Sequence, residues 1–242
     1  MRSSAKRKNP DKWLIEGLAS INLKKYNKAI ESFDRILKID PKNIDAQFNK
    51  GRAVHNLNKF NEAIACYDRV LQIDPGYSKA WRWKGFALRS LERFEEASLC
   101  FGKEIEIEPD GKYAWYIWHN KGQMAHIMEQ FENAIDCYDN AIKLFPGHAD
   151  SWYCKGLASY CMNKYDETVK CCEKALEIDP DYFYAWYGKG LALHSLNSYE
   201  EAIKCYEKVI ENNPDNIDAW FNKKLANRSL EHLKQSKSLC YQ

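Results

Sequence analysis

The stretch Ala185–Pro214, AWYGKGLALHSLNSYEEAIKCYEKVIENNP, is the unit that the rest of the chain copies. Its first half places Trp186 and Gly190 four residues apart, one helical turn. Its second half carries another helical pattern of apolar residues around Tyr206, and Pro214 ends it. We therefore predict two short helices joined by a tight turn.

Prolines mark a fixed period along the chain. The spacings are 34, 34, 37, 34 and 34 residues between Pro41, Pro75, Pro109, Pro146, Pro180 and Pro214. Such a period is typical of a solenoid, in which stacked units bury the apolar face that one unit alone leaves exposed. We predict repeats at 10–43, 44–77, 78–111, 112–148 (with a three-residue insertion), 149–182 and 183–216, and a shortened seventh unit at 217–242.

Charge and composition exclude several classes of protein. Four basic residues lie in residues 1–9, which we predict to be a disordered tail, and without these four charges the +2 chain has a net charge of −2. This balance argues against a nucleic-acid-binding protein. No apolar run is long enough to span a membrane or to form a secretory signal, and the nine cysteines include no Cys-x-x-Cys pair. We expect reduced cysteines and a cytoplasmic location, with no membrane partner.

A glycine recurs at one position of each first helix. The series is Gly17, Gly51, Gly85, Gly122, Gly156 and Gly190. Because glycine inside a helix costs about 1 kcal/mol relative to alanine, its recurrence predicts a close approach of the second helix. Small residues in the second helix should face it: Ala29, Ala63, Ala97, Ala134 and Ala202, with Thr168 in the fifth unit.

These residues resemble the tetratricopeptide repeat (TPR) family, whose pattern is Trp-x-x-Leu-Gly-x-x-Tyr, then Ala-x-x-x-Phe, then Pro. The resemblance covers nearly everything after residue 9. It implies an all-α fold, a right-handed superhelical solenoid of antiparallel helix pairs with about six units and a C-terminal capping unit. It also implies a protein-interaction scaffold that is not an enzyme.

One departure from the family pattern is systematic. The leucine before the glycine is replaced by Lys50, Lys84, Lys121, Lys155, Lys189 and Lys223, with Glu16 in the first unit. We predict that each lysine lays its stem on the neighbouring helix and pairs with a carboxylate at the start of the second helix. The candidates are Glu62, Glu96, Glu167 and Glu201. The alternative is a ladder of ligand-binding lysines.

The junction at residues 100–122 is irregular. Three extra residues precede Gly122, so we predict a first helix that is one turn longer, with Trp115 and Trp118 on nearly the same face. Gly102 and Glu104 also interrupt the preceding helix pattern, which favours a local bend or shifted register. A tolerated irregularity, a hinge and an altered binding groove all remain open.

The seventh unit departs from the pattern too. Lys224 stands where glycine is expected, and Leu233, Ser236 and Cys240 replace a strong second helix. A polar capping unit and a fragment of a longer array are both consistent with this sequence.

No constellation indicates catalysis, a cofactor or a metal. Five cysteines occupy the same position, or slot, in the second helices of consecutive repeats, on the edge of the apolar stripe. We interpret them as core residues: Cys66, Cys100, Cys137, Cys171 and Cys205. His119 and His126 are about 10 Å apart along one helix, too far to share a metal, and Cys154 and Cys161 lack zinc spacing. Phosphate loops and nucleophile motifs do not occur.

What remains is one face of the first helices, opposite the tryptophan and glycine. The family resemblance implies that this face lines a concave groove that binds a partner peptide or protein. Its residues are Phe48, Asn49, Arg52, His55, Lys79, Arg82, Phe86, Arg89, His119, Asn120, Gln123, His126, Tyr153, Leu157, Tyr160, Tyr184, Tyr187, Leu191 and His194. The N-terminal half is basic and amide-rich and the C-terminal half aromatic, so an acidic segment followed by an apolar one would complement it.

Chaperone tails do not fit this face well. Chaperone-binding members of the family hold a C-terminal carboxylate with lysine, asparagine and arginine residues from three repeats. Only Asn49 and Lys79 match them here, and Leu14, Leu18 and Trp83 replace the rest. Besides the scaffold, two functions stay open: a self-associating structural module, and a regulatory or nucleic-acid-binding array that uses the lysines and the basic tail.

Overall fold

The computed structural model describes residues 9–240, with side chains to residue 236. All of the predicted tail at 1–9 except Asn9 lies outside the described residues. The described part is all α-helical and forms two compact units that divide after Gly111. Unit 1 contains α1 (Pro10–Asn22), α2 (Tyr26–Leu37), α3 (Ile44–His55), α4 (Phe60–Ile73), α5 (Ser78–Ser90) and α6 (Phe94–Ile107). Unit 2 contains α7 (Ala114–Ile127), α8 (Phe131–Leu144), α9 (Ala149–Cys161), α10 (Tyr165–Ile178), α11 (Phe183–Ser195), α12 (Tyr199–Asn212) and α13 (Ile217–Cys240).

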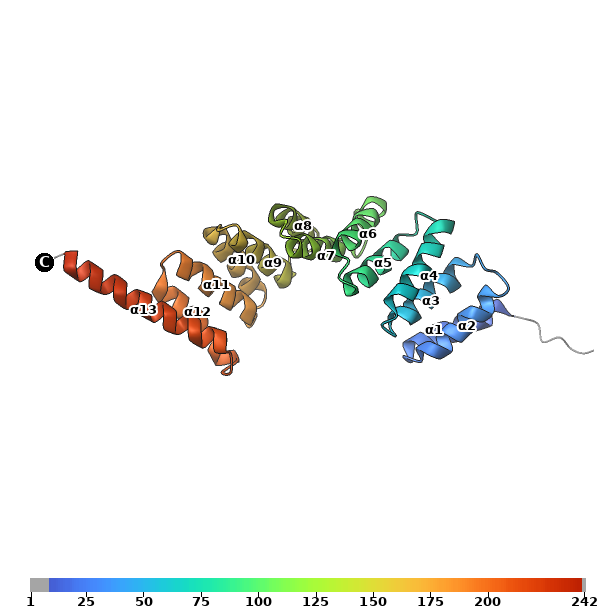
Figure 1. The fold of residues 1–242 in the computed structure, drawn as a ribbon, viewed down its shortest axis with the longest axis horizontal. Helices are drawn as coiled ribbons and strands as arrows, with labels where there is room; N and C mark the ends of the chain where they lie inside the picture. The colour runs from blue at the N-terminus through green and yellow to red at the C-terminus, as the bar shows by residue number, and fades with distance from the viewer. Residues whose placement is uncertain (1–8, 241–242) are drawn as a thin grey trace, which may run out of the picture. The chain divides into compact units, whose positions relative to one another are not determined.

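Within each unit every helix packs against the next one along the chain, as hairpins of helices (Figure 1). Successive first helices also touch each other: α1 with α3, α3 with α5, α7 with α9, α9 with α11, and α11 with α13. The residues on these first helices therefore form one continuous face in each unit.

The glycine series confirms a close approach of the second helix. The nearest contact is an aromatic ring, however, and not one of the predicted alanines Ala29, Ala63, Ala97, Ala134 and Ala202. A Cβ atom at Gly122 would lie 2.7 Å from Tyr138, and the other glycines face the rings of Phe33, Tyr67, Phe101 and Tyr206. These five rings are almost fully buried. Gly156 is the exception, because Cys172 takes the place of the ring in its repeat and Cys171 Cβ is the nearest atom, at 3.0 Å.

The tryptophans that lie four residues before the glycines are half-buried, and Trp220, at the equivalent position of the last unit, is exposed. They are therefore not core residues. Each of four indole Nε1 groups donates a hydrogen bond to a proline carbonyl six residues earlier. The pairs are Trp81 to Pro75, Trp152 to Pro146, Trp186 to Pro180 and Trp220 to Pro214, at 2.9–3.0 Å. This bond ties the start of each first helix to the loop before it.

The insertion before Gly122 does not add a helical turn, contrary to our expectation. α7 has 14 residues where α5 and α9 have 13, and the other extra residues lengthen the loop before Ala114. Trp118 takes the usual tryptophan position, with Lys121 Nζ 5.3 Å from its ring centroid. Trp115 packs instead against Phe145 and His148.

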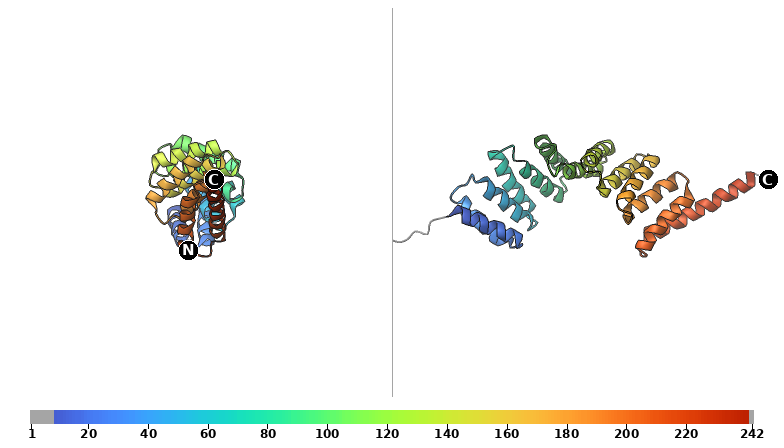
Figure 2. Two further views of the ribbon diagram at one scale, coloured as in Figure 1. Left: turned by 90° about the vertical axis from the view of Figure 1, so that its left-hand side faces the viewer. Right: turned by 180° about the vertical axis from the view of Figure 1, so that it is seen from behind.

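The seventh unit is one continuous helix, α13. Lys224 replaces the glycine that admits a ring, so no second helix can dock as closely as α12 docks on α11. The helix therefore continues, and its C-terminal part extends past α12 (Figure 2). The slot cysteines are buried in the second helices, which confirms that they are core residues.

Candidate functional site

The predicted residues of unit 1 form a face built around a tryptophan that the prediction left out. On α5, Trp83 lies edge-on to His55 at 5.2 Å between ring centroids and to Phe86 at 6.2 Å. The guanidinium of Arg52 lies 5.5 Å from its ring centroid. Because aromatic rings attract cations and stack edge-on, Trp83 holds these side chains in place. Trp83 lies on α5 between two residues that we predicted for this face, Arg82 and Phe86. This position was the signal that sequence analysis missed.

The predicted residues of unit 1 differ in accessibility. Phe48 and Asn49 are buried, and Asn49 Nδ2 donates to the Asp45 carbonyl at 2.8 Å. Arg52, His55, Phe86 and Arg89 are half-buried, and Lys79 is exposed. The accessible part of this face is therefore formed by Lys79 and by the half-buried side chains.

Arg82 is held by an ion pair. It pairs with Glu104 of α6, and Glu104 is only 2% exposed. Burial is the largest influence on Glu104 and raises the pKa of its carboxyl, although the hydrogen bond and charge of Arg82 act in the opposite direction. The ion pair with Arg82 thus explains why Glu104 takes an otherwise apolar position. The helix itself is regular, because α6 has 14 residues, as α4 and α8 do.

The predicted residues of unit 2 form an aromatic face. His119 and Asn120 are buried, Gln123, His126, Tyr153, Leu157, Tyr160, Tyr187, Leu191 and His194 are half-buried, and Tyr184 is 50% exposed. Rings on adjacent helices touch: Tyr153 lies 5.6 Å from Tyr182 and 6.0 Å from Tyr184 between centroids. Asn222 Nδ2 of α13 donates to the Tyr187 hydroxyl at 2.9 Å.

His119 belongs to a partly buried polar cluster that sequence analysis missed. Its Nδ1 lies 2.9 Å from Ser151 Oγ, and its Nε2 lies 3.2 Å from Asp150 Oδ2. The hydroxyl of Tyr182 donates to Asp150 Oδ1 at 2.5 Å. The hydrogen bond from His119 is the largest influence on Asp150 and lowers the pKa of its carboxyl to about 2, despite its partial burial. Asp150 is therefore ionised at neutral pH.

The recurring lysines pair with carboxylates, but mostly not with the predicted ones. The Nζ atoms lie 2.6–2.8 Å from carboxylates of the preceding second helix, in the pairs Lys50–Asp34, Lys84–Asp68, Lys155–Asp139, Lys189–Glu173 and Lys223–Glu207. Of the predicted partners only Glu167 is close, 3.6 Å from Lys155. Helical side chains lean toward the N-terminus of their helix, which turns each lysine toward the preceding repeat.

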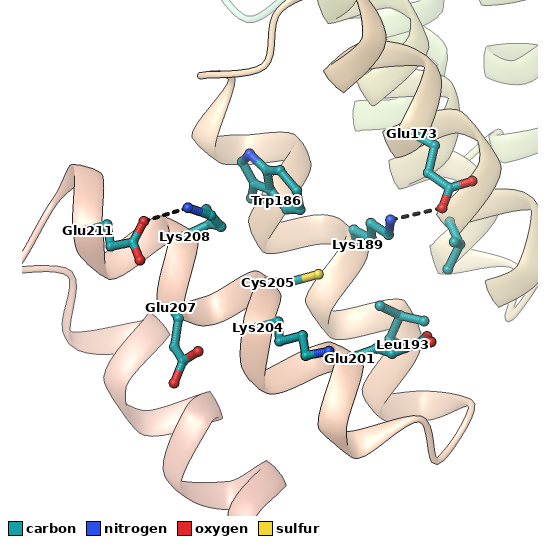
Figure 3. A pocket seen from close by; sticks show the side chains of 11 residues that line it. Glu173, Trp186, Lys189, Leu193, Glu201, Lys204, Cys205, Glu207, Lys208 and Glu211 are labelled. Carbon is teal, nitrogen blue, oxygen red and sulfur yellow. Dashed lines mark hydrogen bonds and ion pairs between the residues drawn. The ribbon is translucent and has the colours of Figure 1, made fainter.

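A hollow of about 510 Å³ lies between α10, α11 and α12 (Figure 3). Trp186, Lys189 and Leu193 line it from α11, and residues of α10 and α12 complete it. Its side chains carry both signs of charge and pair with each other, as in Lys189–Glu173 and Lys208–Glu211 (Figure 3). Part of its lining therefore follows from the lysine pairing that recurs along the chain.

In the described part of the chain, no helix has both the length and the apolar character that crossing a bilayer requires.

Comparisons with known proteins bear on the repeat pattern. A family model described as tetratricopeptide repeat matches residues 115–148, 149–182 and 183–216, and a second model of the same description matches residues 21–82. A search of curated proteins gave no match.

Solved structures share the helical-repeat fold. YrrB, "a TPR protein with an unusual peptide-binding site", is 22% identical, with a TM-score of 0.72 over 81% of this chain and 100% of YrrB. MamA is 23% identical, with a TM-score of 0.65 over 69% of this chain and 96% of MamA. A chain of the APC/C hetero-tetramer Cut9-Hcn1 is 17% identical, with a TM-score of 0.61 over 92% of this chain and 44% of that chain. At these identities the likeness shows the fold alone.

Proposed function

This chain belongs to the tetratricopeptide-repeat family, and from this premise we propose that it is a non-catalytic scaffold that binds a partner peptide or protein on the faces formed by its first helices. Two faces are available, one on α3 and α5 of unit 1 and one on α7, α9 and α11 of unit 2. YrrB is described as having a peptide-binding site, which makes peptide binding a reasonable use of this fold.

The row of tyrosines on unit 2 is the observation that carries this proposal. Tyr184 is 50% exposed, and Tyr153, Tyr160 and Tyr187 each leave part of the ring accessible. Tyrosine offers a large apolar surface and a hydroxyl at a low cost in side-chain entropy, which is why it is enriched in binding sites. Contacts between neighbouring rings hold the row in position before a partner arrives.

The charges suggest what each face binds. Unit 1 presents Arg52, Lys79 and Arg89, which favour an acidic segment. Unit 2 presents mainly uncharged aromatic and histidine side chains, which favour an apolar segment. Electrostatic complementarity of this kind mainly raises the association rate and the specificity, whereas the buried rings supply most of the affinity.

Peptide display followed by calorimetry tests this proposal. Peptides selected on the full chain should bind at least tenfold more weakly, about 1.4 kcal/mol, to a Tyr160→Ala, Tyr184→Ala double variant. A matched control, Lys204→Ala with Glu211→Ala, changes the hollow of Figure 3 and should leave the Kd unchanged. Circular dichroism confirms that both variants keep their helices. Wild-type affinity in the tyrosine variant would contradict the use of this face.

Self-association is the second candidate function, because α13 exposes a stripe of large apolar side chains. Ile217 is 80% and Phe221 is 64% exposed, and Leu225 continues the stripe one turn further. In the six preceding repeats a second helix of the same repeat packs on the first. A second copy of α13 would cover this stripe by a two-fold helix pairing, and a hollow of about 710 Å³ beside Trp220 and Arg228 leaves room for its side chains.

Sedimentation velocity over a wide concentration range tests the second candidate. Self-association predicts a sedimentation coefficient that rises with concentration in the wild type and stays constant in a Phe221→Lys variant. Lys204→Glu on α12 is the charge-change control and should behave like the wild type. A wild-type chain that stays monomeric at every concentration would exclude this function.

A further inference from the structure

Three side chains of different donor type converge between α7 and α9. His119, Asp150 and Cys154 each offer one ligand atom, and these atoms all lie within 4.8 Å of one another. His119 Nε2 is 3.2 Å from Asp150 Oδ2, and Cys154 Sγ is 3.8 Å from Asp150 Oδ1. Asp150 and Cys154 are four residues apart on α9, so one face of that helix presents both to the histidine.

These separations suit a small tetrahedral ion. Zinc bonds to nitrogen, oxygen and sulfur ligands are about 2.0–2.3 Å long, so two tetrahedral ligands lie roughly 3.3–3.7 Å apart. His119 Nε2 and Asp150 Oδ2, 3.2 Å apart, are close to this range, and the ligand atoms of all three residues lie within 4.8 Å of one another. A thiol among the donors also disfavours calcium and magnesium, which take oxygen ligands. We propose that His119, Asp150 and Cys154 bind one zinc-class divalent cation.

Neighbouring groups already orient two of the three ligands. Ser151 Oγ lies 2.9 Å from His119 Nδ1, so in the tautomer that donates to Ser151 the lone pair of Nε2 points to the site. The Tyr182 hydroxyl donates to Asp150 Oδ1 at 2.5 Å and fixes that carboxylate. Metal sites use such outer hydrogen bonds to hold their ligands.

The site has both a closed side and an open side. His119 is buried and Cys154 is half-buried, whereas the side chain of Asp150 is 40% exposed. An ion can therefore enter past Asp150, and the fourth coordination position lies on that side. Three protein ligands with one open position are typical of zinc sites that bind water or another ligand.

Only one pair of repeats carries this donor set. The positions equivalent to His119, Asp150 and Cys154 hold Phe48, Lys79 and Trp83 in the second and third repeats, and Tyr153, Tyr184 and Gly188 in the fifth and sixth. Cys154 also lies outside the slot of core cysteines. The cluster is therefore a local feature added to the repeat pattern, and it does not depend on the proposed peptide binding.

Cobalt titration of the full chain tests the proposal. Reduced, metal-free protein should bind one Co²⁺ per chain and develop a near-ultraviolet thiolate-to-cobalt absorption band, which one equivalent of Zn²⁺ removes. Cys154→Ser should abolish the band and weaken Zn²⁺ binding at least tenfold. Cys161→Ser is the matched control because this exposed cysteine ends the same helix, and it should keep both the band and the affinity.

Two further variants keep the test decisive. Ser151→Ala removes the outer hydrogen bond to His119, together with the contact between Ser151 Oγ and His148 Nδ1 at 2.8 Å, and should lower Zn²⁺ affinity by about 10–100-fold. Should Cys154→Ser fail to fold, Asp150→Asn must weaken Zn²⁺ binding at least tenfold. The proposal fails if no saturable band forms, or if the band survives Cys154→Ser or is lost equally in Cys161→Ser. Zn²⁺ affinity that Asp150→Asn leaves unchanged also overturns it.

Discussion

At the scale of single residues, a glycine packs against an aromatic ring in five of the repeats. The ring of Tyr138 lies over Gly122 so closely that a methyl group would overlap it at 2.7 Å, and four other repeats have the same contact. This contact outweighs the helix propensity that glycine loses. The fifth repeat differs because Cys172 replaces the ring.

We therefore predict different costs for one substitution at two equivalent glycines. Gly122→Ala should lower the free energy of unfolding by about 1–2 kcal/mol, because crowding against Tyr138 exceeds the gain in helix propensity. Gly156→Ala should cost less than Gly122→Ala, because its Cβ would meet Cys171 Cβ at 3.0 Å, a tight contact, and not a ring at 2.7 Å. Urea denaturation of the two variants measures the difference. Equal effects would show that the ring is not the cause.

Buried tyrosine hydroxyls lead to a second prediction. The hydroxyl of Tyr67 is buried and has no hydrogen-bond partner among the residues that the structure describes, and Phe33 and Phe101 occupy the same position in the neighbouring repeats. Tyr67→Phe should raise the free energy of unfolding by about 1 kcal/mol, because it removes an unsatisfied polar group. Tyr138→Phe is the control and should not stabilise, because Tyr138 hydrogen-bonds with Cys154. A loss of stability in Tyr67→Phe would contradict this account.

At the scale of the helix pair, the turn depends on one left-handed residue. Lys24, Asn58, Glu92, Glu129, Asn163 and Asn197 have φ between 57° and 60°. The residue after each of them donates its backbone N–H to a carbonyl five residues earlier, as in Gln130 to Ala125 at 2.8 Å. Glycine and asparagine adopt this conformation most readily, so the glutamates and the lysine are the costly choices.

Glu129→Gly should therefore stabilise the chain by about 0.5–1 kcal/mol, because glycine adopts the required φ of 57° without steric cost. The neighbouring Gln130 has φ of −89°, so Gln130→Gly should give no gain. Thermal melts of both variants measure the contrast. Stabilisation by Gln130→Gly, or its absence in Glu129→Gly, would contradict the assignment of strain to this position.

At the scale of the whole molecule, the same small change in histidine pKa recurs in three repeats. His55, His126 and His194 occupy one slot in three repeats, and each lies edge-on to the aromatic residue that begins the next helix, 5.2–5.3 Å between centroids. Burial lowers the pKa of all three imidazoles, and the charge of Arg89 lowers that of His55 further. The folded chain thus disfavours the protonated form that the unfolded chain accepts near pH 6.5.

We predict that the contribution of these histidines to the free energy of unfolding is fully present above about pH 6.5 and is lost as the pH falls below that value. The reason is that the unfolded chain then binds protons that the folded histidines bind less readily. Urea denaturation at pH 7.5 and pH 5.5 should show a smaller loss in a His126→Gln, His194→Gln variant than in the wild type. A His232→Gln variant, which changes an exposed histidine of α13, is the control and should keep the wild-type pH dependence. An unchanged pH dependence in the double variant would contradict the prediction.

Most of the fold could be predicted from the sequence. For the faces of the first helices, the sequence predicted which residues lie there but not which side chains contact each other. Helix pairs, the close approach at glycine and the buried cysteines all follow from spacing, because the same packing constraint recurs every 34 residues. Which partner a side chain meets does not follow from spacing alone, even where the pairing recurs, as it does between five lysines and the preceding second helix. Lys84 pairs with Asp68 and not with Glu96, and Arg82 is occupied by Glu104, because side-chain direction and burial decide among several carboxylates within reach.

The sequence by itself therefore determined the repeat, its helices and the family. The tertiary structure alone decided which side chains meet between helices. His119 and Cys154 are 35 residues apart, and nothing in either helix alone indicates that the packing of α7 on α9 brings them to one carboxylate. Periodicity reports the contacts that every repeat shares, whereas a cluster that occurs once becomes visible only when two particular helices are placed side by side.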